Sequence, residues 1–485
     1  MTTLVDVGAL AGTVFSGGWH AAAQTATVRE PATGASLGTV GVADAADITR
    51  ATTLAAAAQP AWAAVPPAER AALLRRAATV LEAHRGEIEQ WLVREGGAVV
   101  PKAQSEVAAA RDELWEAAAL PTQPHGTLLP TPAGRASVAR RVPLGVVGVI
   151  SPWNFPLLLS LRAVAPALAL GNAVVLKPDV QTAVSGGYVV ARIFEEAGLP
   201  GDVLHVLAGD AEPGRALTED PRTAMIAFTG STAVGREVGA AAGRALKRVS
   251  LELGGNNAFI VLDDADLEAA ASAGAFGSFF HQGQVCMTAG RHIVAEQVAG
   301  RYVELLAERA RRMTVGDPWT EQVQLGPMIN DAQRDRVHRI VTDTVAVGAV
   351  LHCGGTFEGR FYRPTVLGGV TAKMPAFTEE IFGPVAPVIV VRDDQEAVAV
   401  ANDTEYGLVA AIQTGSVPRA LALAERLATG IVHVNDQTIN DEATVPFGGR
   451  GASGNGTRFG SQHSWDEFTQ WQWVTARSTP CPYPV

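Results

Sequence analysis

Short apolar runs alternate with longer helical runs from residue 145 onward. Residues 145–150 have the composition of a buried strand, and residues 156–170 have the length and spacing of a helix. Short strands that alternate with helices are typical of a parallel sheet covered on both faces, with ligands at the carboxyl ends of its strands. The further elements that this pattern predicts are strands at 173–176, 203–206, 224–228 and 248–251 and a helix at 182–197.

A second series of the same kind follows in the C-terminal half. A small, apolar helical run at 267–280 precedes a short strand at 292–295. The later elements that we expect are helices at 297–313, 332–347, 395–402 and 418–428 and strands at 385–391, 408–414 and 431–435. The pattern therefore predicts two α/β units in one chain.

The two ends of the chain have other patterns. Residues 1 to about 60 carry Gly, Thr and Ala in short alternating runs, which predicts strands. A Pro-rich stretch at 121–132 precedes a predicted strand at 136–142, and residues 465–479 alternate as a strand would, with exposed tryptophans. Such an edge strand favours a partner, so we expect an oligomer contact there. The predicted helices between these segments are 68–85, 86–96 and 102–120.

Composition excludes several classes of protein. The 485 residues carry 38 basic and 49 acidic side chains, for a formal net charge of −11, which argues against a nucleic-acid partner. Three cysteines do not make a disulfide framework, and no residue spacing suits a metal site. Residues 1–26 lack a signal-peptide pattern and prolines interrupt the apolar stretch 142–161, so we expect a cytoplasmic protein with no membrane span.

Four of the predicted strands end in polar or glycine-rich loops. Asn154 stands in a rigid Ser-Pro-Trp-Asn-Phe-Pro loop that can hold its amide as a donor, and Lys177 and Asp179 follow the next strand. The glycine-rich stretch 229–235 opens a helix, where main-chain N–H groups can approach a phosphate, and Glu252 precedes a glycine pair. Each loop alone could be an ordinary turn, but four loops at successive strand ends predict one ligand site.

A single cysteine, Cys286, lies in the loop between the predicted helix 267–280 and the predicted strand 292–295. In such a connection the side chain can face a cleft and the main-chain N–H can be free to donate. The thiolate is the reactive form, and an ordinary cysteine has a pKa of about 8.5, so a reactive site must lower that pKa or supply a base. A buried structural cysteine is the alternative that this stretch leaves open.

The loops carry the motifs WNFP, LKP, FTGST, ELGG, GQVC, EEIFGP and PFGG, in this order along the chain. With this set of motifs the sequence resembles the aldehyde dehydrogenase superfamily over about residues 25–478. The resemblance implies an α/β fold with a Rossmann-type cofactor domain, an α/β catalytic domain and a small β oligomerisation extension. The implied boundaries are 1–121 with 142–252 for dinucleotide binding, 253–464 for catalysis, and 122–141 with 465–485 for oligomerisation.

The resemblance also implies the roles of four catalytic residues. Cys286 would be the nucleophile that attacks the aldehyde. The side-chain amide of Asn154 and the main-chain N–H of Cys286 would form the oxyanion hole. Glu252 would activate the water that hydrolyses the thioester, and could first deprotonate the thiol. Lys177 would be the fourth catalytic residue, and it would also bind the adenosine ribose hydroxyls.

The cofactor that the resemblance implies is NAD, with NADP as an alternative. Relatives that prefer NAD often carry a glutamate three residues after the lysine, where it rejects a 2′-phosphate. Here that position is Val180, with Asp179 adjacent. Glu380 would hold the nicotinamide ribose and Phe382 would lie against the nicotinamide. The full set of expected cofactor-binding residues is Ile150, Ser151, Pro152, Trp153, Lys177, Asp179, Val180, Phe228, Gly230, Ser231, Val234, Leu253, Gly254, Glu380 and Phe382.

For the substrate, the residues to compare are 177–179, 182–187, 281–292, 435–442 and 451–454, and there the sequence resembles the benzaldehyde and vanillin dehydrogenase branch. The expected substrate pocket consists of Phe155, Leu158, Leu159, Arg162, Phe280, Val285, Met287 and Phe447. Arg162 stands where succinate-semialdehyde relatives place a carboxylate-binding arginine, but the second arginine of those relatives is Phe280 here. An aromatic aldehyde is therefore favoured, with a structural ion pair as the expected role of Arg162. Because acyl-CoA-forming relatives generally lack the glutamate that is Glu252 here, the expected product is the free acid.

Three other readings remain open at this point. The substrate could be succinate semialdehyde or an aliphatic aldehyde. A cofactor-free cysteine hydrolase would use His281 or His292 as its base. A non-catalytic relative is a third class, which the intact Cys286, Glu252 and Asn154 argue against. The expected partners are a small-molecule aldehyde and further copies of the chain, as a homodimer or homotetramer.

Overall fold

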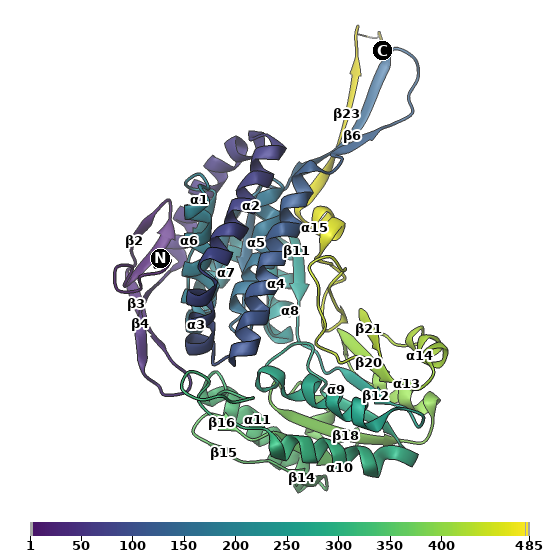
Figure 1. The fold of residues 1–485 in the computed structure, drawn as a ribbon. Coiled ribbons are helices and arrows are strands. Elements are labelled where there is room, and N and C mark those ends of the chain that lie inside the picture. The colour runs from purple at the N-terminus through teal and green to yellow at the C-terminus, as the bar shows by residue number, and fades with distance from the viewer. Residues whose placement is uncertain (1–2, 481, 484–485) are drawn as a thin grey trace.

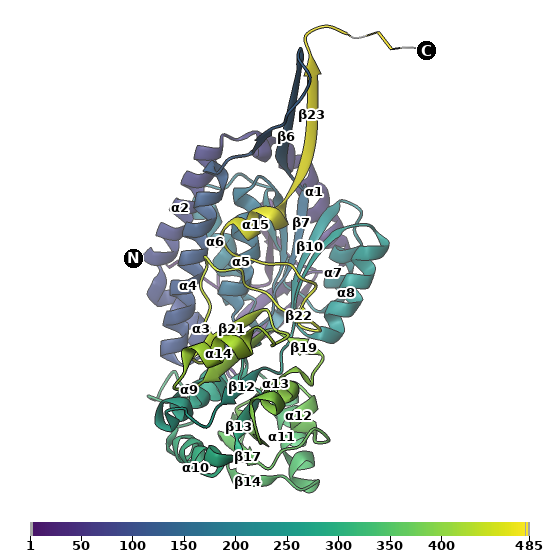
Figure 2. The ribbon, with the colours of Figure 1, turned by 90° about the vertical axis from the view of Figure 1, so that its right-hand side faces the viewer.

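The structure is a computed structural model, and it describes residues 3–480 and 482–483. Two seven-stranded sheets and one three-stranded sheet organise the chain. The first large sheet and its helices lie above the second in Figure 1, and the three-stranded sheet projects from the body in both views (Figures 1 and 2). In the described part of the chain, no helix is both long and apolar enough to cross a membrane.

The strand order of the first sheet reverses next to β7. From β7 the chain adds β8 and β9 on one side, and then returns to add β10 and β11 on the other, all in parallel. Such a reversal opens a crevice at the carboxyl ends of the strands concerned. In spatial order the strands are β11 (Arg248–Glu252), β10 (Thr223–Thr229), β7 (Val146–Ile150), β8 (Ala173–Lys177), β9 (Leu204–Val206), β1 (Thr13–Ser16) and β2 (Trp19–Ala21).

Helices cover both faces of this sheet. Alternation along β7 directs Val146 and Ile150 into one core cluster and Val147 and Val149 into another. On the first face lie α1 (Ala45–Ala64), α7 (Ala211–Glu219) and α8 (Thr232–Arg244). On the second face lie α5 (Pro156–Ala169) and α6 (Val189–Glu196), with α2 (Pro67–Ala83), α3 (Arg85–Gly96) and α4 (Val100–Ala119) packed outside them.

The second sheet is parallel except for its edge strand β14. In spatial order its strands are β14 (Val350–Cys353), β17 (Thr365–Gly368), β18 (Val385–Val391), β13 (Arg291–Ala295), β12 (Ala258–Val261), β20 (Val409–Gln413) and β21 (Ile431–Val434). The helices of this half are α9 (Leu267–Phe279), α10 (Glu296–Arg312), α11 (Asp331–Ala346), α12 (Pro375–Thr378), α13 (Asp394–Asn402) and α14 (Val417–Ala424). The short strand pairs are β3 (Gln24–Arg29) with β4 (Ser36–Val42), β15 (Phe357–Glu358) with β16 (Phe361–Tyr362), and β19 (Tyr406–Gly407) with β22 (Arg450–Gly451).

The projecting sheet joins distant parts of the chain. Its strands are β5 (Gly126–Leu128), β6 (Arg135–Pro143) and β23 (Thr469–Arg477), and β6 pairs with β23 in antiparallel register from end to end. The side chains of Trp471 and Trp473 on β23 are 57% and 66% exposed. Arg141 stacks on the ring of Trp471 with its Cζ 4.2 Å from the centroid. In the described chain β23 is therefore an edge strand with exposed aromatic side chains.

The α/β class and both strand series are as predicted, but three local expectations are wrong. Residues 45–64 form α1 and not a strand, because Asp44 supplies a capping box and the segment is rich in alanine, the best helix former. Residues 465–468 belong to α15 (Ser461–Phe468), and the strand begins only at Thr469. The predicted helix 182–197 is an α-helix only from Val189, because a 3-10 turn, η2 (Val180–Thr182), and a π-helix, η3 (Val184–Tyr188), precede α6.

Candidate active site

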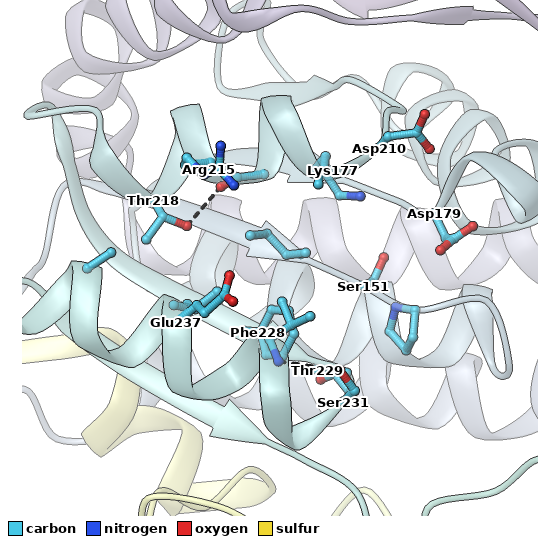
Figure 3. A pocket seen from close by; sticks show the side chains of 18 of the residues that line it. Ser151, Lys177, Asp179, Asp210, Arg215, Thr218, Phe228, Thr229, Ser231 and Glu237 are labelled. Carbon is cyan, nitrogen blue, oxygen red and sulfur yellow. Dashed lines mark hydrogen bonds between the residues drawn. The ribbon is translucent and has the colours of Figure 1, made fainter. Parts of the chain in front are cut away.

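A cavity of about 720 Å³ lies at the point where the strand order of the first sheet reverses. The ends of β7, β8 and β10 supply one side of it, and α7 and α8 supply the other (Figure 3). Ten of the fifteen predicted cofactor residues line this cavity: Ile150, Ser151, Pro152, Trp153, Lys177, Asp179, Phe228, Gly230, Ser231 and Val234. A cleft of this size at a strand-order reversal is the usual dinucleotide site of such a sheet.

The charged groups of the cavity suit a nucleotide. Lys177, at the end of β8, is buried and donates a hydrogen bond of 2.6 Å from its Nζ to the main-chain oxygen of Gly209. Burial lowers the pKa of this ammonium, against the opposing charges of Asp179 and Asp210. Ser231 caps α8 by accepting a hydrogen bond of 3.4 Å from the N–H of Val234, and because both residues line the cavity, the N-terminus of α8 lies at its edge.

Sequence reasoning missed the far wall of the cavity. Arg215, Thr218 and Glu219 come from α7, and Glu237 and Arg244 come from α8. These residues belong to no motif, and all but the buried Thr218 are exposed, so spacing alone gives no sign that two helices face one cavity. Figure 3 shows Arg215, Thr218 and Glu237 across the cavity from Ser151 and Asp179. The predicted residues that do not line the cavity are Val180, Leu253, Gly254, Glu380 and Phe382.

Three of those five residues, Gly254, Glu380 and Phe382, contact one another or the wall of the cavity instead. The carboxylate of Glu380 accepts a hydrogen bond of 2.9 Å from the N–H of Gly255, and burial raises its pKa to about 7. A side chain at Gly254 would displace this carboxylate, so the glycine allows the close approach. The ring of Phe382 meets the ring of Trp153 edge-on at a centroid distance of 5.6 Å. Trp153 also lines the cavity, so this contact joins the cavity to the second half of the chain.

The loop that leads to Cys286 has an unusual backbone. The backbone φ values of His281, Gln282 and Gly283 are 51°, 58° and 67°. This is the left-handed conformation, which residues other than glycine rarely adopt. The amide of Gln282 holds the loop by donating to the main-chain oxygens of Gly97, at 3.1 Å, and Pro327, at 2.8 Å. A side chain at position 283 would collide with the carbonyl of Gly383. The turn therefore depends on both its glycine and these distant acceptors.

Two asparagines fix the surroundings of Cys286. Asn154 is buried and donates from Nδ2 to the main-chain oxygen of Gln284 at 3.0 Å, and its second amide hydrogen has no acceptor among the described residues. Asn257, which sequence reasoning missed, donates from Nδ2 to the oxygens of Cys286 and Thr288, both at 2.8 Å. Within residues 3–480 the Cys286 N–H makes no hydrogen bond. Two loops thus bring two donors without acceptors in the described chain, the Asn154 amide and the Cys286 N–H, near one partly exposed thiol.

The acid–base state of the site follows from burial. Glu252 is buried at the end of β11, and neither of its carboxylate oxygens has a hydrogen-bond partner in the described part of the chain. Burial raises the pKa of Glu252 well above its ordinary value, while the cations Arg162 and Arg458 lower it. Burial, with the charges of Glu252 and Glu380, raises the pKa of Cys286 to about 12. The resting thiol is therefore protonated, and its reaction requires a base.

Most of the predicted substrate residues gather around Cys286. Val285, Met287 and Phe447 are core members of one apolar cluster, against which Phe155, Phe280 and Cys286 pack. Leu158 and Leu159, on the first turn of α5, are not among its members. Arg162 touches the cluster from outside, with its Cζ 4.6 Å from the centroid of the Phe447 ring.

The two histidines near the loop are not placed as bases. His292 is fully buried, and its ring nitrogens bond Ser278 Oγ and Tyr302 Oη, both at 2.7 Å. Burial lowers the pKa of His292 to about 3. His281 packs edge-on against Phe155, and burial and the charge of Lys102 hold its pKa well below the ordinary value. These contacts do not support the cofactor-free hydrolase.

Comparisons with known proteins agree on one family. Residues 19–474 match the family described as the aldehyde dehydrogenase family. The chain is 55% identical to a vanillin dehydrogenase of Amycolatopsis sp. and 52% identical to a benzaldehyde dehydrogenase [NAD(+)] of Pseudomonas putida, over 98% of each protein and of this chain. It is 38% identical to a mitochondrial succinate-semialdehyde dehydrogenase of Arabidopsis thaliana, over 93% of this chain and 86% of that protein.

Solved structures give the same result for the fold. A betaine aldehyde dehydrogenase of Staphylococcus aureus in complex with NAD+ superposes with a TM-score of 0.95 at 27% identity, over 98% of this chain and 97% of that one. An E. coli NADP-dependent enzyme superposes with a TM-score of 0.94 at 33% identity, over 97% of this chain and 99% of that one.

Proposed function

Since the chain belongs to the aldehyde dehydrogenase family, we propose that it oxidises an aromatic aldehyde of the benzaldehyde or vanillin type to the free acid, with NAD as oxidant. The observation that carries this proposal is the apolar cluster around Cys286, together with the 52–55% identity to relatives of that specificity. A flat, uncharged ring suits such a cluster because its burial removes apolar surface from water.

The cavity at the end of the first sheet fits a dinucleotide. Its volume of about 720 Å³, the buried Lys177 and the capped N-terminus of α8 match what the ribose and phosphate groups require. Its far wall carries Arg215 and Arg244 beside Glu219 and Glu237. When bound, the nicotinamide ring would accept a hydride from the substrate carbon.

The chain's own groups account for the remaining chemistry. Because its pKa is raised, the Cys286 thiol must lose its proton to a base as sulfur attacks the carbonyl carbon, and Glu252, the carboxylate whose charge acts most strongly on that thiol, would take the proton. The free amide hydrogen of Asn154 and the Cys286 N–H would stabilise the oxyanion. After oxidation the acyl group remains on sulfur as a thioester. Glu252 would then take a proton from the water that attacks it and releases the acid.

Arg162 argues against succinate semialdehyde as the substrate. Its guanidinium is buried between the carboxylates of Glu113 and Asp441, so its charge is already matched. A substrate carboxylate would therefore meet two acidic groups and no free cation. Phe280 stands where a second arginine would be needed, which leaves the pocket apolar on that side.

A substrate panel tests the proposal. Formation of NADH is followed with benzaldehyde, vanillin, hexanal and succinate semialdehyde, and then with NADP in place of NAD. We expect the highest kcat/KM with one of the two aromatic aldehydes and NAD, and a kcat lower by about 10³-fold or more for the Cys286→Ala protein. A highest kcat/KM with succinate semialdehyde would overturn the substrate assignment while leaving the family intact.

We also propose that the chain assembles as a homodimer or homotetramer through the projecting sheet. The exposed tryptophans and the free edge of β23 support this assignment, because an unpaired edge with aromatic side chains favours pairing with a second copy. We also propose a division of the chain into domains, with dinucleotide binding assigned to 1–121 with 142–252, catalysis to 253–464, and assembly to 122–141 with 465–485. The two large sheets support that division, and α15 qualifies it, since it packs against α5 of the first half.

A further inference from the structure

The last turn of α3 carries a fully buried carboxylate, Glu95, that does not line the nucleotide cavity. Its Oε1 accepts a hydrogen bond of 2.8 Å from the N–H of Val184. Its Oε2 accepts bonds from the N–H of Ser185, at 2.7 Å, and from the Ser185 hydroxyl. Hydrogen bonds to an ionised acceptor are roughly twice as strong as those between neutral groups. Glu95 therefore holds residues 184 and 185 firmly against α3.

These donors belong to the segment that follows the cofactor lysine. β8 ends at Lys177, and the π-helix η3 begins at Val184. Between them Asp179 caps η2 by accepting a hydrogen bond of 2.9 Å from the N–H of Gln181. Lys177 and Asp179 both line the nucleotide cavity. The first N–H groups of a helix have no acceptor within it, and Glu95 supplies one for η3. The carboxylate therefore holds one end of a short segment whose other end lies in the cavity.

Two residues beyond Glu95, the chain meets the loop that carries Cys286. Gly97 caps the end of α3 with a left-handed φ of 68°, and its carbonyl accepts the hydrogen bond from the Gln282 amide. The backbones pack so closely here that a side chain on Gly326 would meet the Gly97 carbonyl at 2.3 Å. Gln282 thus ties the end of α3 to the catalytic loop, and the close packing leaves this junction little room to shift.

The loop at 326–330 links the same two segments a second time. Asn330 Nδ2 donates to Gln181 Oε1 at 2.7 Å, and the N–H of Ile329 donates to Gln284 Oε1 at 3.0 Å. Gln181 lies in the segment that follows the cofactor lysine, and the main-chain oxygen of Gln284 accepts the bond from the Asn154 amide. Two separate sets of hydrogen bonds therefore join the cofactor segment to the catalytic loop.

We propose that the last turn of α3 fixes the cofactor segment 177–188 and the catalytic loop 281–286 relative to each other, with Glu95 as a positioning residue. Glu95 acts through Val184 and Ser185, and not by contact with the nucleotide or the thiol. A change at Glu95 then alters the reactivity of Cys286, and a change at Gln282 alters the affinity for NAD, since such a coupling is reciprocal. This inference rests on NAD binding in the cavity and does not depend on which aldehyde is oxidised.

The test begins with Glu95→Gln, whose amide has one acceptor oxygen in place of two and cannot satisfy both N–H groups. We expect the Kd for NAD to rise about tenfold or more through the loss of charge-assisted bonds. Without NAD, the rate at which iodoacetamide alkylates Cys286 should rise about threefold or more, because a loosened loop reduces the burial that keeps the thiol protonated. Calorimetric titration gives the Kd, and mass spectrometry of the labelled peptide gives the rate.

Glu87→Gln is the matched control. Glu87 lies on the same helix, and its carboxylate accepts hydrogen bonds from the N–H groups of Leu4, at 2.8 Å, and Val5, at 2.9 Å. It therefore makes the same kind of contact with a segment that does not line the cavity. This variant should leave both the Kd for NAD and the alkylation rate unchanged, whatever its effect on Tm.

Gln282→Met tests the link from its other end. It removes the hydrogen bonds that the Gln282 amide donates to Gly97 and Pro327. Gln282 does not line the cavity, yet the Kd for NAD should rise about threefold or more.

The outcomes that overturn the inference are distinct. If Glu95→Gln does not raise both the Kd for NAD and the alkylation rate, Glu95 does not connect the two segments. If Glu87→Gln produces both changes as well, general destabilisation explains them and the inference is wrong. Should Glu95→Gln fail to fold, Gln282→Met decides alone, and an unchanged Kd for NAD then overturns the inference. None of these measurements uses an aldehyde, so the substrate panel tests the proposed oxidation independently.

Discussion

The ammonium of Lys102 donates a hydrogen bond of 2.8 Å to the main-chain oxygen of Asn154. Lys102 is buried in α4, where it pairs with Glu106 one turn later and lies 4.1 Å from the centroid of the Phe155 ring. Glu106 in turn accepts hydrogen bonds from the N–H groups at the start of α5, at 3.0 Å from Leu157. One ion pair on α4 therefore holds both the loop that carries Asn154 and the helix after it.

Replacing Lys102 should misplace the Asn154 amide. For Lys102→Met we expect kcat to fall by about 10²-fold, the usual effect of losing one oxyanion donor, and the protein to lose about 3–5 kcal/mol of stability because Glu106 is left buried and unpaired. Lys373→Met, an exposed lysine, is the control. The double variant Lys102→Met with Glu106→Leu should regain stability but not kcat, and recovery of kcat would show that Lys102 does not position Asn154.

Of the two described cysteines, only Cys286 should matter for turnover. Cys286→Ala is expected to reduce kcat by about 10³-fold or more, since no other nucleophile can hold the acyl group. Cys353 lies in the edge strand β14 outside the apolar cluster, so Cys353→Ala should leave the steady rate unchanged. Reaction with an alkylating reagent, followed by mass spectrometry, checks that the Cys286 thiol is accessible in the folded protein. An equal loss of kcat in Cys286→Ala and Cys353→Ala would contradict the assignment of Cys286 as the nucleophile. Cys481 lies outside the described residues.

Glu252→Gln should separate the two halves of the reaction. We expect a pre-steady-state burst of NADH to persist while the steady rate falls by about 10²-fold or more, because the amide cannot take a proton from water. Rapid-mixing absorbance measures both phases in one experiment. An unchanged steady rate would exclude Glu252 as the base for hydrolysis.

The pH profile should report the same carboxylate. Burial raises the pKa of Glu252, and only its ionised form is a base, so kcat should rise with pH through that raised pKa. Arg458 Nη1 and Glu252 Oε1 lie 2.7 and 2.8 Å from the point where a side chain on Gly448 would begin, so the cation lies near the carboxylate. Arg458→Met should move the rise in kcat to higher pH, while Arg458→Lys should leave it in place. If the pH profile of kcat is the same in both variants and in the unaltered protein, Arg458 does not influence the pKa of Glu252.

Lys177 should affect the cofactor and not the chemical step. For Lys177→Met we expect the KM for NAD to rise about tenfold, the loss of a charge-assisted bond, with a smaller change in kcat. Initial rates at varied NAD and saturating aldehyde give both constants. A fall in kcat with an unchanged KM for NAD would instead support a catalytic role for Lys177.

The projecting sheet should control assembly. Replacing Trp471 and Trp473 by alanine is expected to weaken the oligomer by about 2 kcal/mol or more, as for aromatic anchors at other interfaces, and to shift the mass toward the monomer at low concentration. Light scattering after size exclusion gives the mass. Trp319→Ala, which removes an exposed tryptophan of the second half, should leave the mass unchanged. Identical masses for all three proteins would place the contact elsewhere.

The sequence alone determined the order of strands and helices and the loops that end them. Asn154, Lys177 and Glu252 could be placed because each follows an apolar run, and apolar runs of four to seven residues mark buried strands. Cys286 could be placed in a connection for the same reason. Helix α1 was missed because alanine-rich segments lack a clear apolar periodicity, although Asp44 and the residues after it carry a capping signal.

Only the tertiary structure decided which distant groups meet. Lys102, Asn257 and Arg458 act on residues dozens to hundreds of positions away, through hydrogen bonds and charges that form when separate helices, strands and loops pack. The protonation of Cys286 and Glu252 was equally undetermined, because a pKa depends on how far burial removes the group from water and on the charges around it. A chain pattern specifies local conformation, but neither solvent exclusion nor a long-range contact exists until the chain has folded.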